Sequence, residues 1–206
     1  MSTTVRAYPD VQGPEHFTRS SLGWVPWIQP LPAEEFTERH YDGLVERERA
    51  AFPYFALLAR DPEVLRARTL TDLDIFTNED GGISRAEREL AAAAASRVNG
   101  CVFCASVHAR AAATLSGRGE DVDRLLAEGT SAALGERWDA IVAAADALTV
   151  IPNRFGETQI AGLRAVGLDD HEIADVIASA AFFNWANRLM LSLGQPTVPA
   201  RTAARA

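Results

Sequence analysis

Two cysteines and a histidine stand close together in the middle of the 206-residue chain and carry the groups needed for thiol chemistry. Cys101 and Cys104 are three residues apart, and His108 follows four residues after Cys104. On a helix these spacings place all three side chains on one face. A thiolate is a strong nucleophile, and an imidazole beside it can take the proton that the thiol must lose. The pattern therefore predicts redox or metal-binding chemistry at this cysteine pair.

Two helices must hold these residues in place. Ser84 and Glu87 form the S-x-x-E pattern of a capping box, so a first helix is expected to begin near Arg85. Gly100 tolerates the left-handed backbone conformation that ends helices, and a second helix is expected from about Cys101. The free N–H groups at the start of that second helix favour negative charge, so they would lower the pKa of a thiol placed there.

Glu89 belongs to the same site if the two helices fold back on each other at Gly100. At 1.5 Å rise per residue, Glu89 and His108 are then both roughly 12–16 Å from the turn, on facing helices. A carboxylate, an imidazole and two thiols would share one pocket. These groups are sufficient for proton relay and dithiol chemistry.

The pattern E-x11-C-x2-C-x3-H, which ends at His108, resembles the alkylhydroperoxidase D-like branch of the carboxymuconolactone decarboxylase superfamily. The late F-F-N-W-A-N-R-L run is similar to its peroxidase-related subgroup. The resemblance implies an all-α helical bundle and a thiol-dependent peroxidase that reduces organic hydroperoxides. By that resemblance, Cys104 is the peroxidatic thiol and Cys101 resolves its sulfenic acid to a disulfide. His108 and Glu89 would take the thiol proton and return one to the leaving alkoxide. The founding alkylhydroperoxidase has a relay histidine before its second cysteine, where this chain has Phe103.

The same resemblance implies the cofactor and the partners. No haem, flavin or metal ion is required, and an external dithiol, lipoyl-type or comparable, resets the disulfide. That dithiol would be carried by a reductant protein. Family members form dimers, trimers or hexamers, so a homo-oligomer is expected.

Three alternatives use the same residues differently. A non-enzymatic, redox-responsive helical scaffold would be oxidised once without turnover, and Phe103 in place of the relay histidine leaves this reading open. An acid/base enzyme of the carboxymuconolactone decarboxylase type would need His108 but neither thiol. Zinc could bind Cys101, Cys104 and His108 with a water molecule, although structural zinc sites have four protein ligands.

Composition excludes several classes of protein. The net charge of −8 argues against nucleic-acid binding, which needs a concentrated basic surface. All 20 basic residues are arginine, so no lysine can form a Schiff base. The first residues lack the apolar core of a signal peptide, and no apolar run reaches the ~18–20 residues that span a bilayer. A cytoplasmic protein with no membrane partner is the expectation.

Turn and capping signals divide the chain into an N-terminal arm (1–32), a helical domain (33–195) and a C-terminal tail (196–206). The absence of an alternating strand pattern predicts helices only. Besides the two helices at the cysteine site, helices are expected over residues 33–50, 62–78, 121–128, 136–149, 158–166 and 170–193.

An internal repeat is suggested by residues 82–87, whose G-hydrophobic-S/D-x-x-E pattern returns at residues 167–172. Asn99 of the first copy matches Asn184 of the second. The match predicts two related helical units about a local pseudo-twofold axis. Chance recurrence of capping residues is the alternative, and the second copy lacks the cysteines.

Two further features leave alternatives open. Trp24 and Trp27 lie in the arm, and they could pack on a neighbouring subunit or cover this chain's own core. Residues 184–188 are a polar run inside an otherwise apolar helix. They could line the pocket, cap a subunit interface, or be buried polar groups satisfied by the backbone.

Overall fold

Helices account for most of residues 5–199, the part of the chain that the computed structural model describes. In chain order the α-helices of this range are α1 (Glu38–Leu44), α2 (Pro53–Leu58), α3 (Pro62–Thr77), α4 (Arg85–Val98), α5 (Val102–Ser116), α6 (Gly119–Glu128), α7 (Glu136–Thr149), α8 (Glu157–Ala165) and α9 (Asp170–Leu193). The 3-10 turns η1 (Ala33–Glu35) and η2 (Arg47–Ala51) flank α1, and the strands are β1 (Gly23–Pro26) and β2 (Gly194–Thr197). No helix within these residues is long and apolar enough to cross a bilayer.

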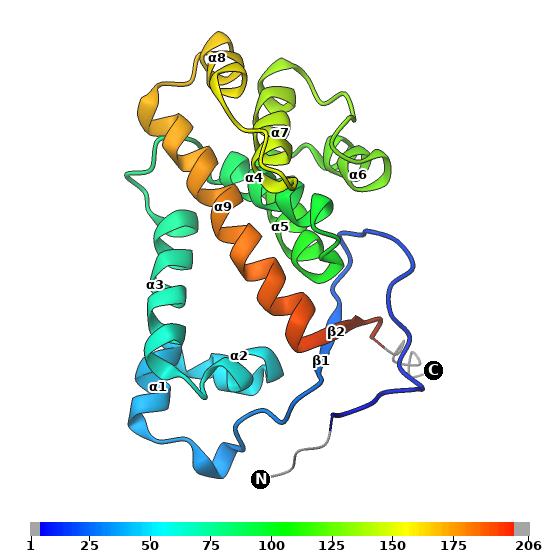
Figure 1. Cartoon of the computed structure of the whole chain (residues 1–206), viewed down its shortest axis with the longest axis vertical. Helices are drawn as coiled ribbons and strands as arrows, with labels where there is room; N and C mark the ends of the chain where they lie inside the picture. The colour runs from blue at the N-terminus through cyan, green and yellow to red at the C-terminus, as the bar shows by residue number, and fades with distance from the viewer. Residues whose placement is uncertain (1–4, 200–206) are drawn as a thin grey trace.

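The strands correct the expectation of a purely helical chain. β1 and β2 pair antiparallel and form a small two-stranded sheet beside the end of α9 (Figure 1). Four residues a strand are too few for an alternating pattern to be visible. The pairing also depends on close approach, because a Cβ at Gly194 would lie 2.2 Å from the Val25 carbonyl oxygen. Trp24 lies in this sheet and is 8% exposed. It packs in this chain's own core, as the second of the two alternatives for this residue predicted.

Helix α4 lies at the centre of the molecule and packs against α5, α7 and α9, with α9 crossing diagonally in front of it (Figure 1). Residues 91–95 are all alanine and fully buried, so the backbones of these helices can approach closely. The capping box at Ser84 begins α4, as expected. Gly100, with φ of 76°, provides the left-handed turn, and Cys101 is the N-cap of α5. The predicted helix–turn–helix is therefore confirmed.

The single helix predicted over residues 33–50 is wrong. The segment breaks into η1, α1 and η2, and α1 ends at Leu44 because Val45 has a left-handed φ of 64°. This turn places Leu44, which is fully buried, in a second small core cluster with Leu31 and Leu65. Packing from distant residues thus decides the local structure here. Helix α2 was not predicted, whereas α3 and α6 to α9 begin and end within two residues of their expected bounds, and α5 begins within one residue of its expected start.

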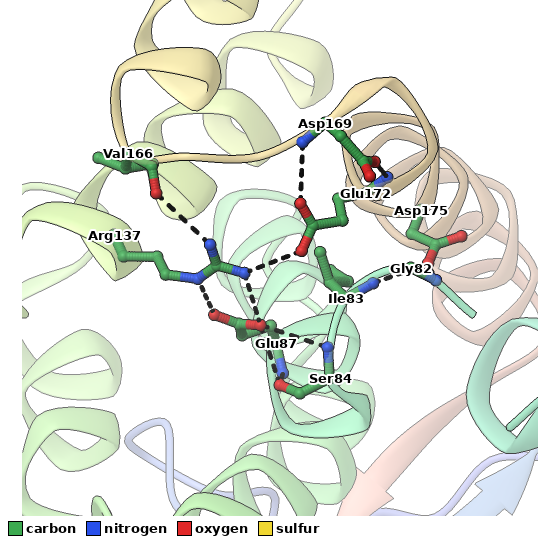
Figure 2. Close-up of polar contacts among 9 residues, drawn as sticks. All are labelled: Gly82, Ile83, Ser84, Glu87, Arg137, Val166, Asp169, Glu172 and Asp175. Carbon is green, nitrogen blue, oxygen red and sulfur yellow. Dashed lines mark hydrogen bonds and ion pairs between the residues drawn. The ribbon is translucent and has the colours of Figure 1, made fainter. Parts of the chain in front are cut away.

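Arg137 of α7 joins the starts of α4 and α9 (Figure 2). Its guanidinium donates to Glu87 at 2.6 Å and to Glu172 at 3.4 Å, and each of these glutamates closes a capping box, with Ser84 and Asp169 respectively. Burial raises the pKa of Glu87, but hydrogen bonds from Arg137 and Ser84 outweigh it and lower that pKa below its usual value. The ionised carboxylate therefore stabilises the fold above its unfolded-state pKa, and this contribution is lost as pH falls through the folded-state value.

The contact at Arg137 bears on the suggested repeat. Glu87 and Glu172 occupy matching positions of the two sequence copies, and they meet at one guanidinium. The matching pair Asn99 and Asn184 also touches, with 3.1 Å between the Asn99 amide nitrogen and the Asn184 oxygen. Such contacts between matching positions are what a pseudo-twofold axis would produce, and the axis itself stays a prediction.

Candidate active site

The two cysteines meet at the first turn of α5. Both are free thiols, and their Sγ atoms lie 2.8 Å apart. Cys101 is 1% exposed and Cys104 is 5% exposed. The S–S bond of a disulfide is about 2.05 Å long, so a small movement of either side chain would allow the bond to form.

The two thiols have opposite pKa shifts. The hydrogen bond between the two sulfurs lowers the pKa of Cys101 despite its burial, with further donation from the Cys104 backbone N–H and the Asn187 amide. The pKa of Cys104 is raised well above its usual value by the same hydrogen bond and by burial. The direction of these two shifts favours a negative charge on Cys101, the N-cap of α5, over one on Cys104.

His108 and Glu89 meet across α5 and α4, as the rise along the two helices predicted. The His108 Nδ1 and the Glu89 Oε2 are 2.6 Å apart, and Arg85 also contacts this carboxylate at 3.4 Å. The imidazole lies against the rings of Phe76 and Phe183, at centroid distances of 5.2 and 3.9 Å. When Nδ1–H donates to Glu89, Nε2 is the ring nitrogen left to accept a proton. Among residues 5–199, no hydrogen bond joins the imidazole to either sulfur.

A cavity of about 550 Å³ lies between β1, α2, α3, α5 and α9. Its wall is mostly aromatic and aliphatic, and consists of Leu22, Gly23, Trp24, Phe52, Pro53, Tyr54, Phe55, Arg68, Asp72, Phe103, Cys104, Val107, His108, Phe183, Ala186 and Met190. Cys104 and His108 are part of this wall, whereas Cys101 and Glu89 are not. A molecule bound in the cavity would therefore meet the Cys104 sulfur and the imidazole first.

Asn187 is the member of the polar run 184–188 that reaches the site. It is fully buried; its amide nitrogen donates to the Ser96 hydroxyl at 3.0 Å, and its oxygen accepts from Asn99 at 3.0 Å. Its amide also lowers the pKa of both cysteines. Asn187 is thus buried and bonded to side chains, which differs from satisfaction by the backbone, whereas Trp185 and Arg188 of the same run are exposed. The signal that could have identified Asn187 is a polar residue inside an apolar helix.

Replacing Asn187 by leucine is expected to lower the free energy of unfolding by about 1–3 kcal/mol, because Ser96 and Asn99 lose a buried partner. It should also raise the pKa of Cys101, since one donor to its thiolate is removed. Denaturant unfolding and a pH titration of the thiolate absorbance measure the two effects. Asn184→Leu is the control, because Asn184 bonds to Asn99 and Thr149 but to neither sulfur. An unchanged thiol titration in Asn187→Leu would contradict the proposed donation.

Tyr54, Arg68 and Asp72 are polar residues of the cavity wall that sequence reasoning missed. They come from α2 and α3, far along the chain from the cysteines, and no motif marks them. Within the part of the chain that the structure describes, no three His, Cys, Asp or Glu side chains are grouped so that they could hold a metal ion.

Comparison with known proteins agrees with this fold. Residues 62–147 match the model of the carboxymuconolactone decarboxylase family. An uncharacterized peroxidase-related protein from Silicibacter sp. TM1040 is 26% identical over 95% of this chain and 100% of its own, with a TM-score of 0.65. The alkylhydroperoxidase AhpD core protein from Ralstonia eutropha JMP134, a peroxidase-related protein, is 24% identical over 80% and 88% of the two chains, with a TM-score of 0.67.

The debrominase Bmp8 has the same fold, with 17% identity over 80% of this chain and 88% of its own and a TM-score of 0.63. A search of curated proteins gave no match. The family match over residues 62–147 and the peroxidase-related structures support a relation of this chain to the alkylhydroperoxidase D-like and carboxymuconolactone decarboxylase superfamily.

Proposed function

We propose that the protein is a thiol-dependent peroxidase that reduces organic hydroperoxides through Cys101 and Cys104. One observation carries the proposal. Cys104 lines an apolar cavity, with the Cys101 sulfur 2.8 Å from its own and the Glu89–His108 pair at the same cavity. The peroxidase-related proteins among the similar structures support it.

The position of each sulfur, rather than its resting charge, gives the two roles. The pKa of Cys101 is lowered, but Cys101 lies off the cavity wall, whereas Cys104 lies on the wall and its pKa is raised. Ionising Cys104 beside an anionic Cys101 would place two negative charges together. An imidazolium formed when His108 takes the proton offsets one of them, and the Glu89 carboxylate stabilises that imidazolium.

The reaction then proceeds in two balanced steps. The Cys104 thiolate attacks the terminal oxygen of the hydroperoxide; an S–O bond forms, the O–O bond breaks, and the alkoxide leaves and takes a proton. Cys101 attacks the resulting sulfenic acid, an S–S bond forms, and hydroxide leaves as water with a second proton. In total, one hydroperoxide and two thiols give one alcohol, one water and one disulfide.

Intact-mass spectrometry tests this function. One equivalent of cumene hydroperoxide added to the reduced protein is expected to remove the mass of two hydrogen atoms, and dihydrolipoamide should restore the original mass. Protein whose thiols have first been alkylated is the control and should not change. Stable addition of oxygen without loss of hydrogen, or no change at all, would contradict a dithiol peroxidase.

The proposed reductant is a lipoyl-type or comparable dithiol on a partner protein. A homo-oligomer in the cytoplasm is part of the same proposal. Exposed apolar side chains on α5 and α9 support assembly, among them Leu115 at 49%, Trp185 at 41% and Leu191 at 38% exposure.

A further inference from the structure

The two sulfurs of the site differ in their access to solvent. Cys104 is part of the cavity wall, whereas Cys101 is 1% exposed and is not among the described residues that line the cavity. Cys101 is held instead among buried residues of α4 and α9. Its backbone N–H donates to the Ser96 carbonyl at 2.9 Å, and the fully buried Asn187 amide donates to its sulfur. A reagent that enters the cavity therefore meets Cys104 and not Cys101.

This difference bears on how a disulfide between the two cysteines is reduced. The sulfurs are already 2.8 Å apart, so disulfide formation leaves them almost where they are. Thiol–disulfide exchange begins when a thiolate attacks one sulfur of the disulfide and the other sulfur leaves. Because Cys104 is the sulfur on the cavity wall, the incoming thiolate bonds to Cys104 and Cys101 leaves.

The surroundings of Cys101 suit a leaving thiolate. Its pKa is lowered, and a thiol of lower pKa leaves a disulfide faster. Two of the donors that lower this pKa, the Cys104 backbone N–H and the Asn187 amide, do not depend on a free Cys104 thiol. They are therefore still present when Cys104 is bonded to the reductant.

The cavity also restricts what can carry the attacking thiol. Cys104 is 5% exposed, so a thiol on the surface of a folded domain does not reach its sulfur. A thiol at the end of a slender arm does, and the cavity of about 550 Å³ has room for such an arm. The charged residues Arg68 and Asp72 of the wall already pair with each other at 3.0 Å. A charged arm would lose its water without gaining a free partner, so an uncharged arm fits best.

We infer that the reductant enters through the same cavity as the hydroperoxide and attacks the sulfur of Cys104, with Cys101 as the leaving thiolate. This inference rests on the proposed peroxidase function and gives the route of its second substrate. First, a thiolate of the reductant bonds to Cys104, the Cys104–Cys101 bond breaks, and Cys101 takes the electron pair. The second thiolate of the reductant then attacks the reductant's sulfur in this mixed disulfide, and Cys104 leaves. Two electrons pass to the protein, and the two protons lost by the reductant become available to the two cysteines.

A tryptophan at the cavity wall tests the shared route. Val107 lines the cavity and is 36% exposed, so Val107→Trp adds a large ring beside the path to Cys104. Two reactions are measured separately, by alkylation of free thiols and intact mass. They are oxidation of the reduced protein by cumene hydroperoxide, and reduction by dihydrolipoamide of a disulfide formed with diamide. Val107→Trp is expected to slow both reactions about 10-fold or more, because access to one sulfur limits both.

Leu115→Trp is the matched control for that variant. Leu115 lies on the same helix, is 49% exposed and is not among the described residues of the wall. Each rate should change less than about 3-fold in this control, because access to the sulfur is unaltered. If Val107→Trp slows oxidation alone, or slows neither reaction, the shared route is wrong.

A monothiol identifies the attacked sulfur, because it cannot complete the second step. Diamide-oxidised protein is treated with benzyl mercaptan and quenched with acid, and the remaining free thiol is labelled with N-ethylmaleimide. Fragmentation of the peptide that contains both cysteines is expected to place the benzyl group on Cys104 and the maleimide on Cys101. A benzyl group on Cys101, or none on Cys104, would overturn the inference.

These reduction experiments separate the inference from the proposed function, because diamide forms the disulfide without a hydroperoxide. If cumene hydroperoxide does not oxidise the wild-type protein, the peroxidase function fails, whatever sulfur the monothiol attacks. If cumene hydroperoxide does oxidise it and the benzyl group is on Cys101, the function stands and the inference alone fails.

Discussion

Replacing Cys104 by serine is expected to reduce the turnover of an organic hydroperoxide on the order of 10³-fold or more, because the nucleophile is removed. A serine hydroxyl does not ionise near neutral pH and cannot form a sulfenic acid. Replacing Cys101 is expected to give a different defect. Cys101→Ser retains the thiol on the cavity wall, so it should be oxidised once and then stop as a sulfenic acid. Steady-state assays with a dithiol reductant, and trapping of the sulfenic acid with dimedone, measure the two outcomes.

Each of the two cysteine variants is the control for the other. Both substitutions are nearly isosteric and lie one helical turn apart, so a general loss of folding would affect both and would be visible in thermal unfolding. If Cys101→Ser turns over and Cys104→Ser traps one sulfenic acid, the two roles are exchanged. If both keep full steady-state activity, the dithiol does not perform the reaction. A non-enzymatic redox sensor would instead show one oxidation of the wild-type protein and no turnover with any dithiol.

Local signals in the sequence were sufficient to predict the part of the site that lies on α4 and α5. The S-x-x-E capping box located the start of α4, and Gly100 located the turn, because a left-handed φ restricts the choice of residue. With both helices placed, the rise per residue alone brought Glu89 opposite His108. These inferences needed only contacts within one helical hairpin.

The opposite wall of the cavity could not be predicted in the same way. Tyr54 lies on α2, and the path of the chain before α2 depends on the turn at Val45 and the packing of Leu44. Arg68 lies on the predicted α3, yet nothing in its own sequence context distinguishes it from a solvated arginine. Its burial arises when α3 packs beside α2 and α9, where Arg68 lies over the rings of Phe55 and Phe182. Likewise, the order of the two cysteine pKa values depends on which thiol donates.

The relation between Glu89 and His108 separates the remaining hypotheses, because each uses it differently. A peroxidase needs the imidazole only to remove the Cys104 proton, so a preformed thiolate would bypass it. An acid/base enzyme of the carboxymuconolactone decarboxylase type would need the imidazole for its own substrate at every pH and would not need the thiols. A pH profile of a variant at Glu89 therefore distinguishes the two.

Glu89→Gln is expected to lower kcat/KM for hydroperoxide reduction by about 10²–10⁴-fold near neutral pH. The imidazolium formed on proton transfer is mostly buried between Phe76 and Phe183, and it would lose the carboxylate 2.6 Å from its Nδ1. Arg85→Gln is the matched control. It removes the other partner of the same carboxylate, but that arginine side chain is 49% exposed, so a change of less than about 3-fold is expected.

The raised pKa of Cys104 determines whether the defect of Glu89→Gln grows or shrinks as pH rises. The pKa of Cys104 is raised well above its usual value by its hydrogen bond to Cys101 and by burial, so at neutral pH its thiolate forms only when a base takes the proton. As pH rises towards that pKa, solvent hydroxide supplies the thiolate without the imidazole. The defect of Glu89→Gln should therefore shrink with increasing pH, measured as the ratio of wild-type to variant kcat/KM. A ratio that stays constant across the alkaline range would mean that Glu89 supports the fold or a different reaction, rather than ionisation of Cys104.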